Sequence, residues 1–397
     1  MDPRDHYSLA MPTTTPRPNP NARLFDAHLD LACLEALGRD MSIEDPRQAD
    51  RPHPPGAITL PALARSGIRA CLATIFTETN GKEQVTGYAS GDHPASRDAA
   101  LRQLGIYRAW NDAGHIGLGR DALARAVAAP IENAHTTRAQ SMPPPAVALL
   151  IEGADPIAGP DDLPMWKDAG AVAIGLTWAH SSKYAAGNAA DPRDNPGLTP
   201  EGRSLVRAMD DLGLVHDTSH LSDRALADLL SATDAVVIAT HSNCRSLIDT
   251  EPTRESAIPR ELKNDPVARA RIMQRHLTDD SIREIARRGG TIGINFYSPF
   301  LNPGGTRDRR APLDAIADHA EHIMQLAGHD HGVGLGTDID GGFGSTMLPR
   351  GLDTIDQLPI LAEHLTTRGW SQATIDRFLW QNWADFWSRT LRPRIQN

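Results

Sequence analysis

Leu24-Phe25-Asp26-Ala27-His28-Leu29-Asp30 is an apolar run that carries an imidazole and ends at a carboxylate. Four more apolar segments of the chain lead into a side chain that can bind a metal ion: Glu152, His220, His241 and Asp338. Imidazoles and carboxylates are costly to bury unless they are paired or bound to a cation. Their repeated position after apolar runs therefore predicts one shared polar centre.

Eight short apolar segments alternate with stretches of helical character. They cover residues 24–29, 68–76, 146–151, 171–177, 214–217, 235–240, 291–296 and 332–337. Continuous apolar runs are typical of parallel strands that are covered on both faces. Their alternation with helices indicates βαβ units, and their number favours a closed (β/α)8 TIM-type barrel of the metal-dependent hydrolase kind. In such barrels the catalytic groups follow the carboxyl ends of the strands, which is where the candidate ligands fall.

Capping residues mark the starts of three intervening helices. Thr199 followed by Pro200 predicts one, and Ser222 and Thr278 predict two more. Long polar stretches at 78–94, 180–196 and 248–274 interrupt the alternation, and we expect them to be loops over the carboxyl face of the barrel.

The composition limits the classes of function. Residues 1–22 are rich in Pro, Thr and Asn and predict a disordered tail, followed by a single metallohydrolase domain over 23–397. A formal net charge of −10 argues against nucleic acid or an anionic membrane as partner, and no apolar stretch is long enough to span a bilayer. The three cysteines, Cys33, Cys71 and Cys244, have no CxxC spacing and fit a reduced, cytoplasmic compartment or simple burial.

Each candidate ligand has an ordinary alternative when it is taken alone. His28 and Asp30 alternate along a strand and so point to the same side, but they could be a polar pair facing a turn. Glu152, which precedes a glycine, could be an acid at a helix start. Asp217 could orient the imidazole of His220 from behind. Together the set provides enough nitrogen and oxygen ligands for two divalent ions.

Six motifs in this order match a known family. They are Asp26-Ala27-His28-Leu29-Asp30, Ile151-Glu152-Gly153, Gly197-Leu198-Thr199, Asp217-Thr218-Ser219-His220, His241-Ser242-Asn243 and Gly334-Leu335-Gly336-Thr337-Asp338-Ile339-Asp340-Gly341. From about Arg23 to the C-terminal helices the chain resembles the renal (membrane) dipeptidases, which are zinc peptidases with an amidohydrolase-like barrel. The resemblance implies hydrolysis of a small dipeptide-like substrate.

The resemblance also implies a centre of two zinc ions. One ion would bind His28 and Asp30, the other His220 and His241, and Glu152 would bridge them as a catalytic residue. A hydroxide between the ions would attack the scissile carbonyl. Asp338 would orient that hydroxide and pass its proton to the leaving amine, whereas Asp340 is expected to be structural.

The substrate-binding side matches the family less completely. Family members carry an Arg before a helix that grips the substrate carboxylate. Arg275 matches by local sequence, Arg254 matches by spacing, and either could be an ordinary surface residue. Family members also carry a substrate-contacting His after a Leu-Thr pair, where this chain has Trp178. Tryptophan can donate one hydrogen bond but carries no charge, so this departure bears on substrate preference more than on metal chemistry.

Two other functions stay open beside the dipeptidase. One is an amidohydrolase-type reaction on another small amide, lactone or ester, and the other is a catalytically silent barrel used for binding or assembly. Among the remaining histidines, His216, His319 and His322 are predicted to have structural roles. The tryptophans near the C-terminus indicate core or a subunit contact, which leaves a homodimer open: Trp370, Trp380, Trp383 and Trp387.

Overall fold

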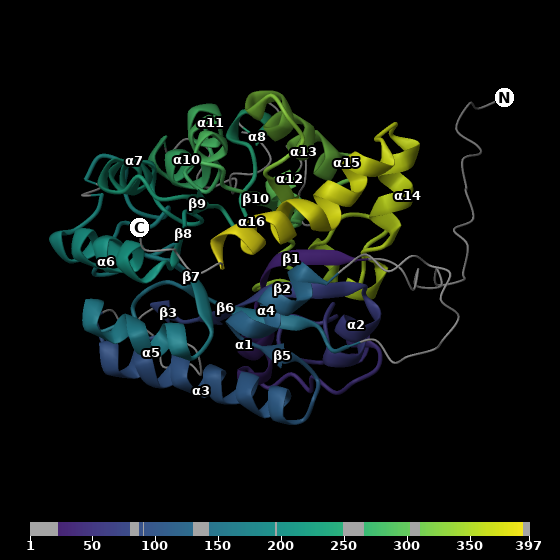
Figure 1. Ribbon diagram of the computed structural model, residues 1–397, viewed down its shortest axis with the longest axis horizontal. Helices are drawn as coiled ribbons and strands as arrows, with labels where there is room; N and C mark the ends of the chain where they lie inside the picture. Colours follow the sequence, from purple (N-terminus) through teal and green to yellow (C-terminus); the bar gives the residue numbers. More distant parts are fainter. Residues whose placement is uncertain are drawn as a thin grey trace.

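The computed structural model describes residues 23–79, 87–89, 91–129, 143–194, 197–248, 266–301 and 310–391. Within these ranges a ring of parallel strands is surrounded by helices (Figure 1). The tail predicted at 1–22 lies outside the described residues.

The barrel strands occur where the apolar segments predicted them. Their bounds are β1 Leu24–Leu29, β2 Ile68–Phe76, β6 Ala146–Glu152, β7 Ala171–Gly175, β8 Val215–Asp217, β9 Val237–Ile238, β10 Ile292–Ile294 and β11 Val333–Leu335. Neighbouring strands pair in parallel in the order β10-β11-β1-β2-β6-β7-β8-β9. A parallel bridge between Ala239 and Ile292 joins β9 to β10 and closes the ring. The prediction of a (β/α)8 barrel is therefore confirmed.

Helices connect and cover these strands. Their bounds are α1 Leu31–Ala36, α2 Leu60–Arg65, α3 His93–Asp112, α4 Arg120–Ala128, α5 Leu163–Asp168, α6 Pro200–Leu212, α7 Asp223–Ala232, α8 Arg245–Ile248, α10 Pro266–Met273, α11 Asp279–Arg287, α12 Ser298–Leu301, α13 Asp314–Ala327, α14 Ile360–Thr367, α15 Gln372–Asp376 and α16 Asn382–Thr390. The predicted caps of α6, α7 and α11 are confirmed, because Thr199, Ser222 and Thr278 each accept a backbone N–H from the first turn. Short strands β3 Glu78–Thr79, β4 Gly87–Tyr88 and β5 Gly117–Leu118 were not predicted, since two residues are too few to show a pattern.

The Trp-rich C-terminal segment belongs to the core of this chain. Trp383 and Trp387 are fully buried, and the ring of Trp383 lies 6.0 Å from that of Phe25 in β1. The indole N–H of Trp383 donates to the carbonyl of Leu335 in β11 at 2.9 Å. The core alternative is thus confirmed for these side chains, which brace the pair β1–β11 from outside the barrel.

Close packing of backbones helps to close the barrel beside the candidate ligands. A Cβ on Gly336, after β11, would lie 1.7 Å from the carbonyl oxygen of Thr240, after β9. Only glycine allows the chain after β11 to approach the chain after β9 this closely. The loops that follow β9 and β11 therefore meet at one edge of the barrel.

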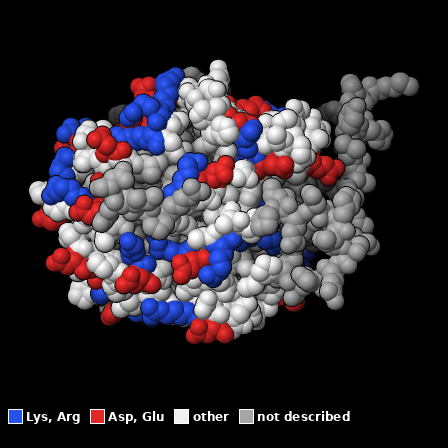
Figure 2. Space-filling view, viewed as in Figure 1, with Lys and Arg blue, Asp and Glu red and all other residues white. Residues whose placement is uncertain are grey.

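The described surface shows charges of both signs. Lys and Arg side chains are interspersed with Asp and Glu on the face shown in Figure 2. Among the described residues, no helix has the length and apolar character that crossing a bilayer would need.

Candidate metal centre

The structure brings the five candidate ligands together at the carboxyl end of the barrel. His28 and Asp30 lie at the end of β1, and Glu152 is the last residue of β6. His220 and His241 follow β8 and β9. Four of these side chains are buried and His220 is half-buried. The strand ends thus gather residues that are far apart in the sequence.

Three imidazoles converge on the two oxygens of one carboxylate. The Nε2 atom of His28 lies 3.3 Å from Oε2 of Glu152. On the other oxygen, Oε1, the Nε2 atoms of His220 and His241 lie at 3.2 and 3.4 Å. Two adjacent groups that share Glu152 result, each with donor atoms close enough to share an ion: His28, Asp30 and Glu152, and Glu152, His220 and His241. A third such group lies behind them: His28, Asp217 and His241.

This donor set fits divalent cations. Although it is buried, Nε2 of His28 has no hydrogen-bond partner among the described residues. A buried polar atom without a partner is costly, and a cation between it and the carboxylates would remove that cost. Imidazole nitrogens with carboxylate oxygens are the ligands that zinc takes in hydrolytic sites.

The electrostatics of the cluster point the same way. Burial opposes a charged His28, but the nearby carboxylates of Glu152 and Asp30 raise its pKa to about 10. Burial and the charge of Glu152 raise the pKa of Asp30 to about 6. Burial and then the charge of Arg275 lower the pKa of His220 to about 4. Positive charge is therefore stabilised beside His28, and His220 is held neutral, as a metal ligand must be.

The second nitrogen of each imidazole is also engaged. Nδ1 of His220 lies 3.1 Å from Oδ1 of Asn188, in the loop between β7 and α6. Nδ1 of His28 and Nδ1 of His241 lie 3.1 and 3.0 Å from one atom, Oγ1 of Thr240. The hypothesis that Asp217 orients His220 was wrong. Asp217 instead accepts the backbone N–H and the hydroxyl of Thr240, because β8 lies alongside β9.

Asp338 follows β11 and lies beside the cluster. Its Oδ2 accepts from the side-chain amide of Asn295 at 2.8 Å, a partner that the sequence analysis missed. Burial raises the pKa of Asp338 well above its usual value, and the charges of Asp30 and Glu152 raise it further.

The backbone is strained at two of these residues. Asp338 has φ of +58° and His220 has φ of +66°, a left-handed conformation that costs side chains other than glycine on the order of 1–3 kcal/mol. Such strain persists where the surroundings fix the backbone, and it is concentrated at functional sites.

Arg275, at the end of the 248–274 stretch, reaches the cluster from the loop before α11. Its Nη2 donates to the carbonyl of His241 at 2.8 Å and its Nη1 to the hydroxyl of Ser242 at 3.2 Å. Its Nε has no hydrogen-bond partner among the described residues, although the side chain is buried. The rival Arg254 lies outside the described residues.

Comparisons with known proteins identify the family of this chain. A family model described as membrane dipeptidase (peptidase family M19) matches residues 20–259 and 265–393. The chain belongs to the membrane dipeptidase family. This family consists of metallopeptidases, so its members depend on metal.

Two other proteins are similar to this chain in sequence. An uncharacterized Klebsiella pneumoniae protein from the pqqA 5′ region is 32% identical over 243 residues, which cover 60% of this chain and 79% of the relative. The uncharacterized dipeptidase C3A11.10c of Schizosaccharomyces pombe is 27% identical over 241 residues, 60% of this chain and 52% of the relative.

Solved structures of the family have the same fold. A metallopeptidase from Rhodobacter sphaeroides, bound to a phosphinate mimic of L-Ala-D-Ala, has a TM-score of 0.71 at 22% identity and covers 93% of this chain and 99% of its own. The probable dipeptidase PvdM of Pseudomonas aeruginosa has a TM-score of 0.69 at 17% identity, with coverages of 93% and 96%.

Trp178 departs from the family pattern at a position close to the cluster. Its ring lies 5.8 Å from that of His220 and 5.3 Å, edge to face, from that of Phe76. The side chain is half-buried, so it forms part of the wall beside His220.

Other polar residues of this family member have structural roles, as predicted. The carboxylate of Asp340 pairs with the buried Arg39 and accepts the backbone N–H of Ile58 at 2.8 Å. His216 contacts Asp210 at 2.8 Å, and His319 accepts the backbone N–H of Cys244 at 3.1 Å. The third histidine, His322, contacts the half-buried carboxylate of Asp279 and the hydroxyl of Ser246 on neighbouring helices.

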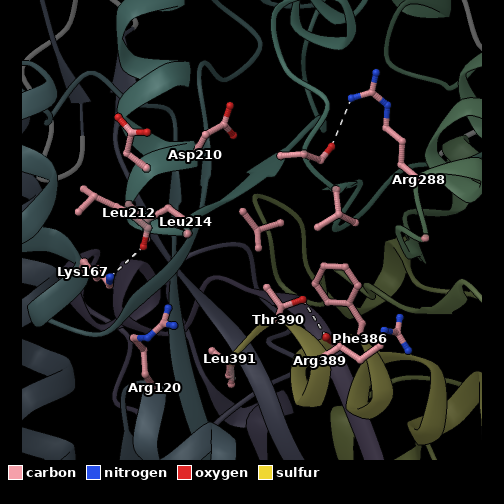
Figure 3. Close-up of a pocket in the computed structure, with 16 residues that line it drawn as sticks. Arg120, Lys167, Asp210, Leu212, Leu214, Arg288, Phe386, Arg389, Thr390 and Leu391 are labelled. Atoms are coloured by element: carbon pink, nitrogen blue, oxygen red, sulfur yellow. Dashed lines mark hydrogen bonds between the residues drawn. The ribbon is translucent and has the colours of Figure 1, made fainter. Parts of the chain in front are cut away.

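A cavity of about 680 Å³ lies at the opposite end of the barrel (Figure 3). It opens where β8 and β9 begin, among Leu214 and Ala235. Two of its cations are already used by backbone carbonyls, since Lys167 donates to Leu212 at 2.8 Å and Arg288 to Ala235 at 3.3 Å. The amino end of a barrel is not where catalysis takes place, so the candidate metal centre at the carboxyl end is the better functional site.

Proposed function

We propose that this chain is a zinc-dependent dipeptidase that hydrolyses the peptide bond of free dipeptides. The observation that carries the proposal is the convergence of three Nε2 atoms on the two oxygens of Glu152, next to Asp338. His28 and Asp30 would hold one ion and His220 and His241 the other, with Glu152 between the two pairs. When bound, the two ions lower the pKa of an attacking water and polarise the scissile carbonyl.

Asp338 moves the proton in this proposal. Its Oδ2 is held by Asn295, which leaves Oδ1 to accept the proton of the attacking water and to pass it to the leaving amine. A raised pKa supports this role, because a carboxyl group must take up the proton before it can donate it.

Arg275 binds the free carboxylate of the substrate in this proposal. Two of its nitrogens are fixed by the backbone of His241 and by Ser242, so the guanidinium plane is already oriented. The unpartnered Nε supports a carboxylate ligand, because planar guanidinium groups pair with carboxylates in a fixed geometry.

A related activity on another small amide, lactone or ester is the alternative. Trp178 is the observation that favours it, because an uncharged indole beside His220 replaces the family's substrate-contacting imidazole. A cytoplasmic location is also our proposal, supported by three buried cysteines without CxxC spacing, which fit a reducing compartment.

The test is metal analysis combined with turnover of a panel of substrates. The panel holds dipeptides of both Cα configurations, their C-terminal amides, and simple lactones and esters. We expect about two zinc ions per chain, loss of dipeptide hydrolysis on chelation, and recovery with zinc. Full dipeptide hydrolysis by metal-free protein would contradict the proposal, and turnover confined to lactones or esters would favour the alternative.

A further inference from the structure

One buried hydroxyl oxygen contacts both candidate metal positions. Oγ1 of Thr240 lies 2.6 Å from Oδ2 of Asp217, 3.1 Å from Nδ1 of His28 and 3.0 Å from Nδ1 of His241. All four side chains are at least 98% buried. His28 belongs to one candidate ion and His241 to the other, so this hydroxyl lies behind both.

The hydrogen bonds of a hydroxyl are limited by its single hydrogen. Burial raises the pKa of Asp217, but Oδ1 accepts two backbone N–H groups, from Thr240 at 2.9 Å and from Ser219 at 3.1 Å, and these hydrogen bonds favour the ionised carboxylate. Oδ2 then accepts the hydroxyl hydrogen of Thr240 in a short, charge-assisted bond. The hydroxyl oxygen then acts only as an acceptor, and the two imidazole nitrogens at 3.0 and 3.1 Å lie closer to it than its remaining neighbour, the hydroxyl of Ser219 at 3.4 Å.

Both imidazoles must therefore donate to Thr240 from Nδ1. A neutral imidazole with its hydrogen on Nδ1 has its lone pair on Nε2, which is the atom that faces Glu152 in His28 and His241. His220 has a separate partner, Oδ1 of Asn188, so its orientation does not depend on Thr240.

We propose that Thr240, held by Asp217, is a positioning residue that fixes His28 and His241 as Nδ1–H tautomers and so prepares one ligand of each ion. The inference rests on the proposed metal centre but needs no assumption about the substrate. Its consequence is that a single hydroxyl controls the affinity of both metal positions.

The chain contains a matched control for this role. Asp26 accepts the backbone N–H of Thr337 at 2.9 Å and its hydroxyl at 2.6 Å, as Asp217 does with Thr240. Among the described residues, no imidazole nitrogen is hydrogen-bonded to the Thr337 hydroxyl. Thr337→Val therefore removes the same type of bond without touching a histidine.

The experiment measures zinc affinity by competition with a chromophoric chelator, and histidine tautomers by ¹⁵N NMR of protein in which histidine is labelled. We expect Thr240→Val to weaken both zinc sites by about 10–100-fold and to lose the Nδ1–H signal of His241 in the metal-free protein. The raised pKa of His28 keeps hydrogens on both of its nitrogens until zinc binds, so its signal serves as an internal reference. Thr240→Ser, which keeps the hydroxyl, should retain both properties. Thr337→Val should keep both zinc affinities within about threefold.

Asp217→Asn tests the direction of the hydrogen bond and provides a second route if Thr240→Val does not fold. The amide oxygen would stay on the two backbone N–H groups, so the amide nitrogen would donate to Oγ1 of Thr240. The hydroxyl hydrogen would then point at one imidazole and move that ring to the Nε2–H tautomer, which weakens one zinc site. The proposal would be overturned if both folded variants kept the zinc affinities and histidine tautomers of the wild type. If Thr240→Val does not fold, the same result in Asp217→Asn alone would overturn it.

These readouts separate the inference from the proposed function. A chain that binds two zinc ions in a Thr240-dependent way but cleaves no dipeptide would contradict the proposed function and leave the positioning role intact. A chain that cleaves dipeptides but whose zinc affinities do not change in Thr240→Val would support the proposed function and contradict the positioning role.

Discussion

Two strand pairs at the carboxyl face of the barrel carry the same Asp–Thr arrangement. In the β1–β11 clamp, Asp26 holds Thr337, and in the β8–β9 clamp, Asp217 holds Thr240. In both, one carboxylate oxygen accepts the threonine backbone N–H at 2.9 Å and the other accepts its hydroxyl at 2.6 Å. Each clamp therefore fastens the end of one strand to the chain that leaves its neighbour.

The two clamps differ in what their threonine hydroxyls contact next. Among the described residues the hydroxyl oxygen of Thr337 accepts one further hydrogen bond, from the backbone N–H of Ile339 at 3.4 Å. Two imidazole nitrogens and the hydroxyl of Ser219 lie about that of Thr240. The residue after each threonine also differs, being Asp338 in one clamp and His241 in the other. The same local device thus positions the proposed proton-transferring acid on one side and the proposed metal ligands on the other.

The largest expected effect is loss of the residue that follows the β8–β9 clamp. His241→Ala removes one of the three nitrogen donors, so we expect reduced zinc content and no measurable dipeptide hydrolysis. Metal analysis together with turnover at saturating zinc tests this. Normal zinc content and turnover in the variant would remove His241 from the ligand set.

The residue that follows the β1–β11 clamp should behave differently. Asp338→Asn keeps the shape of the side chain but cannot carry the proton, so we expect kcat to fall by about 10²-fold or more with zinc content unchanged. Steady-state kinetics and metal analysis on one preparation measure both quantities. If Asp338→Asn lost zinc as His241→Ala does, the division of roles between the clamps would be wrong.

A smaller effect is expected at Arg275, which is fastened to the β8–β9 side through the carbonyl of His241. Arg275→Ala should raise KM for free dipeptides by about tenfold or more, because a charge-assisted pair with the substrate carboxylate is lost. Dipeptide amides lack that carboxylate and serve as the control. Equal changes in KM for free and amidated substrates would mean that Arg275 has only a packing role.

The smallest expected effect is on stability at the β1–β11 clamp. Thr337→Val leaves one oxygen of the buried Asp26 without its hydroxyl donor, which should reduce the free energy of unfolding by about 1–3 kcal/mol. Urea unfolding of the zinc-loaded protein measures this. A loss of zinc larger than that in Thr240→Val would show that the two clamps are not separate.

The candidate metal ligands were easier to predict from the sequence than the residues that hydrogen-bond around them. His28, Glu152 and His241 could be found because each is an exception within or just after an apolar strand, and such exceptions are rare. Asn188 and Asn295 could not be found in this way, since polar residues near loops are ordinary and their contacts depend on which loop faces which strand. Asp217 was noticed but given the wrong partner, because the register between β8 and β9 decides where it points.

The same limit applies to the fold. The barrel strands were predicted from apolar runs, and the capped helices from residues such as Thr199. The short pairing of β3 with β4 and the π-helix Arg377–Gln381 were missed, because tertiary packing rather than local sequence stabilises them.

The β1–β11 clamp has a consequence for how the protein is made. Its two residues are 311 positions apart, so on the ribosome Asp26 and its neighbour His28 are synthesised roughly 15–60 seconds before Thr337 at about 5–20 residues per second. During that time β1 lacks one of its two neighbours in the ring, and its apolar surface and ligands are incompletely covered. Premature capture of a metal ion by the nascent chain, or pairing of the open edge with another chain, is the hazard that this order of synthesis creates.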